Sequence, residues 1–332
     1  MAFIGPDRAA PVTHPLAALD AGNYQAHDLH RGDRVWLETN CYADVWIELL
    51  HALRLNPVAS MAFTVGMDFE GDQWTFFKPP HHDLHRFYGI DVQELALWRP
   101  LELHLAEQLR RGRVPLVEVD AFFLPDTVGV SHGIEHVKTT IAATTIDPLA
   151  RRLGYFHNAG YFELSADDYD GLFAVARAGL SPYAEIVKLD SVTYMDDGTI
   201  RKLATCALRE HVARMPTANP FTEYRSRYES DAAWLRDQDM PVFYAYAFAT
   251  LRQCGACAEL ASAFLHWLAN EDDEQHAAAS SFAKIASAAK AMQFKIARMM
   301  ATGKAGDVSD LLDQMETSWN CAAADLRERH AA

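Results

Sequence analysis

Apolar and polar residues change their spacing about three fifths of the way along the chain. Before residue 195, short runs of β-branched and aromatic residues lie between amphipathic helical segments, which is typical of strands mixed with helices. After it, apolar residues recur at helical spacing through segments rich in Ala, Leu, Arg and Glu. The pattern predicts an α+β fold, with an α/β domain at residues 1–195 and an all-α helical bundle at residues 196–332.

Capping and turn residues divide the chain into predicted elements. In the first domain, helices are expected at 41–54, 81–88, 99–111 and 165–178. Strands are expected at 34–37, 58–67, 74–78, 114–123, 135–146, 152–157, 161–164 and 184–189. In the second domain, helices are expected at 219–236, 241–253, 256–270, 275–302 and 307–329. The acidic turn at 68–73 predicts a hairpin between its two flanking strands, and 114–123 predicts a central strand.

One predicted helix begins with a cysteine. Thr39 and Asn40 are residues of N-cap type, and Cys41 follows them in the first turn of the helix. The unpaired backbone N–H groups and the macrodipole at a helix N-terminus favour the thiolate, which is the nucleophilic form of cysteine. Cys41 is therefore the candidate nucleophile. Its spacing to Val45 and Leu49 equally fits a small core residue, and that alternative stays open.

Two polar residues stand at the ends of neighbouring predicted strands. His136 enters the first strand and Asn158 leaves the second, so antiparallel pairing is expected to bring them side by side. Together with Cys41 they give the order of nucleophile, base and orienter that papain-like enzymes use. His136 would take the thiol proton and Asn158 would orient its ring. His132 is a second candidate base.

Further residues are expected around this centre, and other sites are not. The oxyanion and substrate-binding part is predicted to include Asn40, Asp120 and Lys138. No metal is expected, because His81 and His85 lie one helical turn apart without a third ligand of matching spacing. The pair formed by Cys254 and Cys257 lacks both a second cysteine pair and a strand–helix context, which favours packing of a helix start.

Composition and charge exclude several classes of protein. The formal net charge of −15 argues against a nucleic-acid binder, which needs a basic face. No apolar run approaches the ~20 residues of a membrane-spanning helix, so no membrane is expected. The five cysteines do not form a disulfide framework pattern, and the N-terminal residues lack a signal-peptide pattern. The expected compartment is the cytoplasm.

Several longer stretches resemble a known family. They are Thr39-Asn-Cys-Tyr42, Val119-Asp-Ala-Phe-Phe-Leu-Pro125, Glu135-His-Val-Lys-Thr-Thr-Ile141 and Gly154-Tyr-Phe-His-Asn-Ala-Gly-Tyr161. These stretches, and the helical part of the chain, resemble the bacterial family catalogued as domain of unknown function 1839. The first half is more distantly similar to the butirosin-type acyltransferases, which have a papain-like, cysteine-protease-like fold. The resemblance covers the chain from about residue 25 onward.

The resemblance implies an aminoacyltransferase. Cys41 would accept an aminoacyl group from the phosphopantetheine thioester of a small acyl carrier protein and pass it to an amine, while Asp120 would hold the substrate ammonium. No bound cofactor is expected, because the carrier protein supplies the phosphopantetheine arm, and an amino acid:carrier protein ligase is an expected partner. Two alternatives stay open. One is a cysteine hydrolase, a thioesterase or peptidase, with the same triad, and the other is a non-catalytic scaffold that binds the carrier protein or ligase.

Overall fold

The protein divides into two compact units. The structure, a computed structural model, describes residues 16–32, 34–178, 182–269, 276–304 and 306–330. The sheet unit consists of residues 1–25 and 90–192, and the helical unit consists of residues 26–89 and 193–332. The helical unit therefore holds both the Cys41 helix and the C-terminal helices. The sequence-based domains, 1–195 and 196–332, are consecutive instead and stay a prediction.

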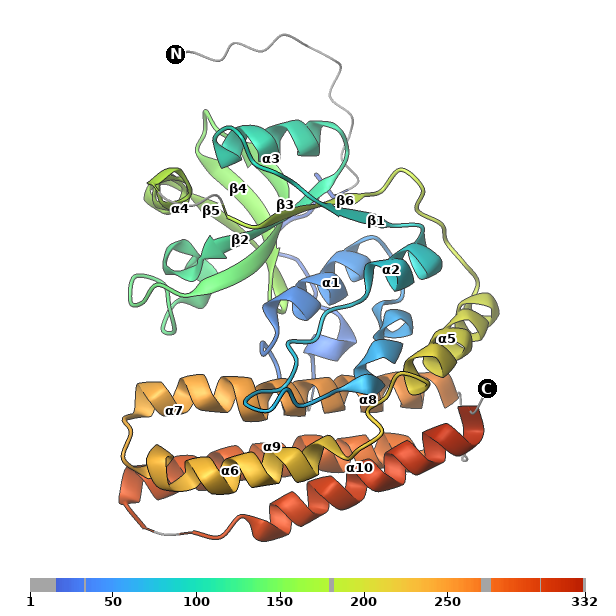
Figure 1. Ribbon diagram of the computed structural model, residues 1–332. Helices are drawn as coiled ribbons and strands as arrows, with labels where there is room; N and C mark the ends of the chain where they lie inside the picture. Colours follow the sequence, from blue (N-terminus) through green and yellow to red (C-terminus); the bar gives the residue numbers. More distant parts are fainter. Residues whose placement is uncertain (1–15, 33, 179–181, 270–275, 305, 331–332) are drawn as a thin grey trace. The chain divides into compact units, whose positions relative to one another are not determined.

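The sheet unit is built on a six-stranded antiparallel sheet with the strand order β1-β6-β2-β3-β4-β5 (Figure 1). The strands are β1 (Asp91–Glu94), β2 (Val114–Asp120), β3 (Lys138–Asp147), β4 (Arg152–His157), β5 (Gly160–Ser165) and β6 (Ala184–Lys188). Five of these strands are predicted within a few residues. The exception is β1, whose residues are mostly exposed and polar and so carry no apolar alternation.

Two helices bury one face of this sheet. They are α3 (Leu101–Arg110) and α4 (Ala166–Ala178), and both are predicted. Alternate residues of the strands, among them Val117, Ile141 and Tyr155, pack in one core cluster with Leu105 of α3 and Phe173 of α4. Side chains two positions apart on a strand share a face, so this alternation sets which residues of each strand enter the core.

The helical unit contains both of the helices that precede residue 89 and the whole C-terminal part of the chain. Its elements are η1 (Asp28–His30), α1 (Cys41–Ala52), η2 (Pro57–Gly66), α2 (His81–Tyr88), α5 (Asp197–Val212), α6 (Pro220–Arg236), α7 (Met240–Ala247), η5 (Phe248–Arg252), α8 (Gln253–Ala269), α9 (His276–Thr302) and α10 (Ser309–His330). Figure 1 shows α6, α9 and α10 running alongside the rod that α7 and α8 form end to end. The helices predicted at 241–253 and 256–270 are continuous, because the π-helical turn η5 joins α7 directly to α8.

Three predicted strands of the helical unit are wrong. Residues 58–67 belong to the 3₁₀ helix η2, where Pro57 occupies a first-turn position and the side chain of Asn56 accepts the N–H of Val58. At 74–78 only an isolated bridge forms, between Phe69 and Trp74. At 34–37 the backbone N–H groups donate to the carboxylate of Glu259 on α8 instead of to a neighbouring strand. A short apolar run does not by itself distinguish a strand from a buried helix.

Among the described residues, the helices are too short or too polar to span a bilayer.

Candidate active site

Cys41 occupies the first position of α1. Its neighbour Asn40 has extended backbone dihedrals, and the side-chain oxygen of Asn40 accepts the N–H of Ala43 at 3.0 Å. Asn40 is therefore the N-cap, as its residue type predicts. Cys41 is a free cysteine and is partly exposed, whereas the rest of the first three turns of the helix is buried. The thiol thus lies at the positive end of a helix that is fixed in the core.

Hydrogen bonds fix both the oxygen and the nitrogen of the Asn40 side chain. Its amide donates to the backbone oxygen of Phe77 at 2.8 Å and to the side-chain oxygen of Gln253 at 3.2 Å. Gln253, the first residue of α8, in turn donates to the backbone oxygen of Thr39 at 3.2 Å. The predicted oxyanion donor Asn40 therefore uses its amide to fix the turn that precedes Cys41. Sequence reasoning missed Gln253, which lies 213 residues from Asn40 and belongs to no local motif.

A cavity of about 310 Å³ lies beside this turn. Its lining is mainly apolar, with four polar side chains: Phe63, Gly66, Met67, Asp68, Trp74, Thr75, Phe76, Phe77, Lys78, Gln253 and Cys257. Phe77 and Gln253 are the two lining residues that hydrogen-bond Asn40, so the cavity adjoins the N-terminus of α1. An apolar pocket with a few polar groups is the usual form of a small-ligand site.

A buried charge cluster lies on the inner side of α1. His30 forms ion pairs with Asp44 at 3.1 Å and with Glu48, and all three side chains are almost fully buried. Burial lowers the pKa of His30, but hydrogen bonds and charges from Asp44 and Glu48 outweigh it and raise the pKa to about 9. Asp44 also accepts the backbone N–H of Asn40 at 3.2 Å. The imidazolium of His30 thus helps to fix the first turn of α1.

In the sheet unit, His136 is paired with a carboxylate. Its Nδ1 lies 2.6 Å from Oδ2 of Asp120, the last residue of β2. The other oxygen of Asp120 accepts the N–H of Phe122 at 3.0 Å, and the Phe122 ring stacks on the imidazole with 4.4 Å between centroids. The His136 side chain is 67% exposed. Asp120 therefore contacts the imidazole of His136, whereas the sequence predicts that it holds a substrate ammonium.

Asn158 lies in the two-residue turn between β4 and β5, with a φ of 45°. The strand register sets its neighbours: Ala142 of β3 lies opposite Phe156 of β4, so Asn158 is level with Thr140 and not with His136. The expected side-by-side placement of His136 and Asn158 is therefore wrong. The two strands are paired as predicted, but with a register that the sequence pattern left undefined.

A buried network missed by sequence reasoning fixes the loop that leads to His136. Asp126, in the 3₁₀ turn η4 (Pro125–Thr127), lies 2.5 Å from Nδ1 of His157 and accepts the hydroxyl of Tyr155 at 2.5 Å. Nε2 of His157 lies 2.8 Å from the hydroxyl oxygen of Thr139. Burial and the Asp126 carboxylate raise the pKa of Tyr155. The network ties the loop to β3 and β4.

The two remaining candidates have carboxylate partners of their own. Nε2 of His132, the second candidate base, lies 3.0 Å from Oδ1 of Asp168 on α4. The ammonium of Lys138, predicted for substrate binding, lies 2.6 Å from Oε1 of Glu118 and is exposed. Within the sheet unit, His136 differs from His132 in its greater exposure.

Comparison with known proteins gives two family-model matches that together span most of the chain. The model described as the DUF1839 N-terminal domain matches residues 25–189, and the model described as the DUF1839 C-terminal domain matches residues 198–328. A search of curated proteins finds no match.

Proposed function

We propose that this chain, which belongs to the DUF1839 family, is a cysteine-dependent aminoacyltransferase. The observation that carries the proposal is the position of Cys41, a partly exposed thiol at the first residue of a buried helix, directly after Asn40, which hydrogen-bonds two residues that line an apolar cavity. His136 is the proposed base, and Asp120 takes the orienting role first assigned to Asn158. The proposed fold of the catalytic part is papain-like, with the nucleophile on a helix and the base at a strand of an antiparallel sheet.

The proposed reaction has two acyl transfers. In the first, the Cys41 thiolate attacks the thioester carbonyl, and the pantetheine thiolate leaves after the tetrahedral intermediate collapses. In the second, an amine attacks the Cys41 thioester, loses a proton to His136 and releases the thiol of Cys41. The N–H of Cys41, in the helix turn that lacks backbone acceptors, is the proposed oxyanion donor, because the Asn40 amide is engaged elsewhere.

The cavity supports an acyl or pantetheine chain as ligand. Its apolar walls match an aliphatic chain, and Lys78 adds one positive charge at its lining. The Lys78 ammonium lies 4.4 Å from the ring centroid of Tyr42, the residue after Cys41. A phosphate group on the arm would pair with such a cation. In this proposal no cofactor stays bound, and the phosphopantetheine arrives on a small acyl carrier protein.

The proposal requires that His136 acts on Cys41 in solution, and alkylation of each cysteine across pH tests this. Cys206 and Cys321 are exposed and serve as internal references, whereas burial raises the pKa of Cys254 and of Cys257 and leaves them slow. We expect Cys41 to react with iodoacetamide faster than both exposed cysteines at neutral pH, as read by peptide mass spectrometry.

Matched variants test whether His136, and not the nearby His132, is the base. His136→Ala and Asp120→Asn should each move the reactivity of Cys41 toward that of the exposed references. His132→Ala, which removes another carboxylate-paired histidine of the same loop, should leave it unchanged. If Cys41 follows the exposed references at every pH in the wild-type protein, or if His136→Ala has no effect, the proposal is wrong.

Product analysis distinguishes a transferase from a hydrolase. With an aminoacylated carrier protein and an amine, a transferase forms the amide and carries the aminoacyl mass on the Cys41 peptide. Cys41→Ala should lower turnover by at least about 10³-fold, as expected for loss of a nucleophile. Release of the free amino acid at the same rate with and without the amine would identify a hydrolase. Carrier binding without turnover, unchanged in Cys41→Ala, would identify a scaffold.

A further inference from the structure

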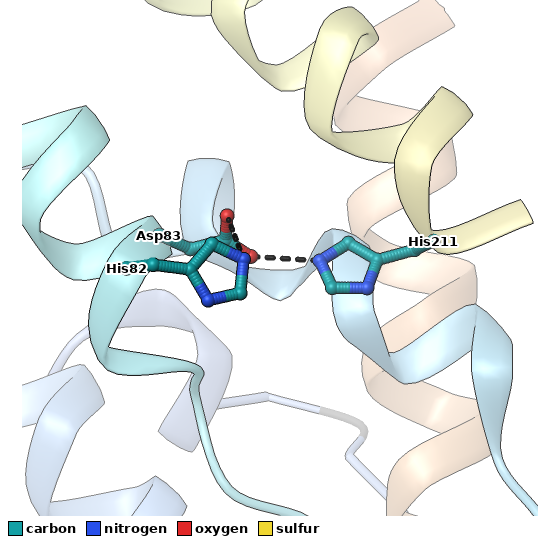
Figure 2. Close-up of side chains that lie close together, drawn as sticks. All are labelled: His82, Asp83 and His211. Carbon is teal, nitrogen blue, oxygen red and sulfur yellow. Dashed lines mark hydrogen bonds and ion pairs between the residues drawn. The ribbon is translucent and has the colours of Figure 1, made fainter. Parts of the chain in front are cut away.

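We propose that His82, Asp83 and His211 form a zinc site that joins α2 to α5 in the helical unit. Figure 2 shows the three side chains converging, with the carboxylate of Asp83 between the two imidazole rings. Nε2 of His211 lies 2.7 Å from Oδ2 of Asp83, and Nε2 of His82 lies 3.3 Å from Oδ1. One donor atom from each residue can be chosen so that all three lie within 4.8 Å of one another.

These separations are close to those of a zinc site. With Zn–N and Zn–O bonds of about 2.0–2.2 Å, neighbouring donors of a tetrahedral ion lie about 3.3 Å apart. The contact of His82 with Oδ1 of Asp83 already has this length, and the contact of His211 with Oδ2 would lengthen by about 0.6 Å. Zinc would replace the proton that the hydrogen bond uses, because an imidazole nitrogen must be unprotonated to bind a metal.

A buried oxygen points to a ligand beyond the hydrogen bond. The Asp83 side chain is fully buried, and its Oδ1 accepts no hydrogen bond from the described residues. A buried carboxylate oxygen without a hydrogen bond is costly, so it calls for an explanation. The pair between Asp83 and His211 accounts for Oδ2 alone. A metal that also binds His82 accounts for the approach of His82 to this carboxylate.

The guanidinium of Arg86 lies near Asp83 but does not hydrogen-bond its Oδ1. Nη1 of Arg86 lies 3.9 Å from Oδ1 of Asp83, beyond hydrogen-bond distance. Nη2 of Arg86 instead binds both carboxylate oxygens of Glu210, at 2.8 and 3.0 Å. Glu210 therefore balances the charge of Arg86, which reduces its repulsion of a metal ion.

The donor set selects the class of metal. Two imidazoles and a carboxylate suit a first-row transition ion such as Zn²⁺ better than Mg²⁺ or Ca²⁺, which prefer oxygen ligands. The His82 side chain is half exposed, so an ion can enter from solvent, and a water or ligand can take the fourth position. The local spacing of His81 and His85 gave no reason to expect a metal, because His211 follows Asp83 only after 128 residues.

Zinc titration of the full chain tests the site. After treatment with a chelator, calorimetry should show one zinc equivalent bound by the wild-type protein. His82→Ala and Asp83→Asn should each lower the affinity for zinc by more than the roughly 10- to 100-fold that loss of an outer-shell partner costs. His85→Ala removes an exposed histidine from the same helix and should keep the wild-type affinity. His82 is at the surface, so its loss should leave the metal-free melting temperature unchanged.

Cobalt replacement identifies the ligands independently of affinity. Co²⁺ at the proposed site should give visible bands of a tetrahedral ion without a thiolate-to-cobalt charge-transfer band, and zinc should raise the melting temperature of wild type and His85→Ala alone. A thiolate band that disappears in Cys206→Ser or Cys41→Ser would place the metal on a cysteine and overturn the proposal. So would equal zinc affinity in His82→Ala and wild type, or no zinc binding at all. None of these outcomes depends on acyl transfer.

Discussion

At the scale of single residues, Gly255 decides how closely Trp36 packs on α8. A Cβ at this position would overlap the indole ring of Trp36, whose Nε1 donates to the backbone oxygen of Ala286 at 3.0 Å. Gly255→Ala should therefore lower the free energy of unfolding by about 1–3 kcal/mol, as overpacking does, although alanine is the better helix former. Urea-induced unfolding measures the change.

Gly66→Ala is the matched control in the same unit. The nearest atom to a Cβ at Gly66 is the backbone oxygen of His211, at 4.0 Å. This variant should be neutral or stabilising by up to about 1 kcal/mol, because alanine restricts the unfolded chain. If both variants behave alike, the close approach of Trp36 is not what requires glycine at 255. The same comparison tests how tightly this part of α8 is packed, where the thiols of Cys254 and Cys257 are also buried.

At the scale of elements, Asp126 fixes the loop between β2 and β3. Its buried carboxylate is the partner of both His157 and Tyr155. Asp126→Ala leaves two buried polar groups without that partner, so we expect a loss of about 2–6 kcal/mol of stability, at ~1–3 kcal/mol for each group. Hydrogen exchange should become faster in the segment 124–137, which includes His136, than in β3.

Asp168→Ala is the control for that prediction. It removes the partner of His132, another histidine of the same loop, but both side chains are partly exposed. A partly exposed ion pair contributes about 0–1 kcal/mol, so this variant should change stability little. Equal losses in the two variants would mean that the loop is not anchored through Asp126.

At the scale of the whole molecule, the buried His30 and the partly buried His27 make the stability of the protein depend on pH in opposite directions. The pKa of His30 is raised to about 9, so its contribution is complete below the unfolded value of ~6.5 and is lost as pH rises through 9. Burial and the charge of His51 lower the pKa of His27 to about 4, so its contribution is present above ~6.5 and is lost as pH falls through 4. Stability should therefore be greatest near pH 6.5.

Chemical unfolding between pH 6 and pH 10 measures the larger of these effects. We expect the wild-type protein to lose on the order of 3 kcal/mol over that range from His30, since one pKa unit corresponds to ~1.4 kcal/mol. His30→Gln should be less stable at pH 6 and should lack the decline that the wild-type protein shows below about pH 8.5, whereas the buried thiols of Cys254 and Cys257, whose pKa values are raised, keep a decline above it. A wild-type stability that rises toward pH 10 would contradict the assignment of His30 as a buried imidazolium.

Local signals explain which elements could be predicted. The start of α1 at Cys41 follows from the capping type of Asn40, and the end of α2 follows from Gly89, whose φ is 68°. The strands β2 to β6 follow from β-branched alternation between turn residues. The prediction of a strand at 58–67 is wrong because the apolar run there carries no period that distinguishes a strand from the 3₁₀ helix that forms.

The amino-acid sequence by itself determined the chemistry that is available: a cysteine at a helix start, a histidine before a strand and the antiparallel strands that follow. Residue type and local spacing carry that information. The tertiary structure decided the partners. The strand register places Asp120, and not Asn158, beside His136. The packing of α8 places Gln253 beside Asn40. Helix packing likewise brought His211 to Asp83. Such contacts join residues far apart in the chain, and their geometry is set by the burial of whole elements, which no local pattern encodes.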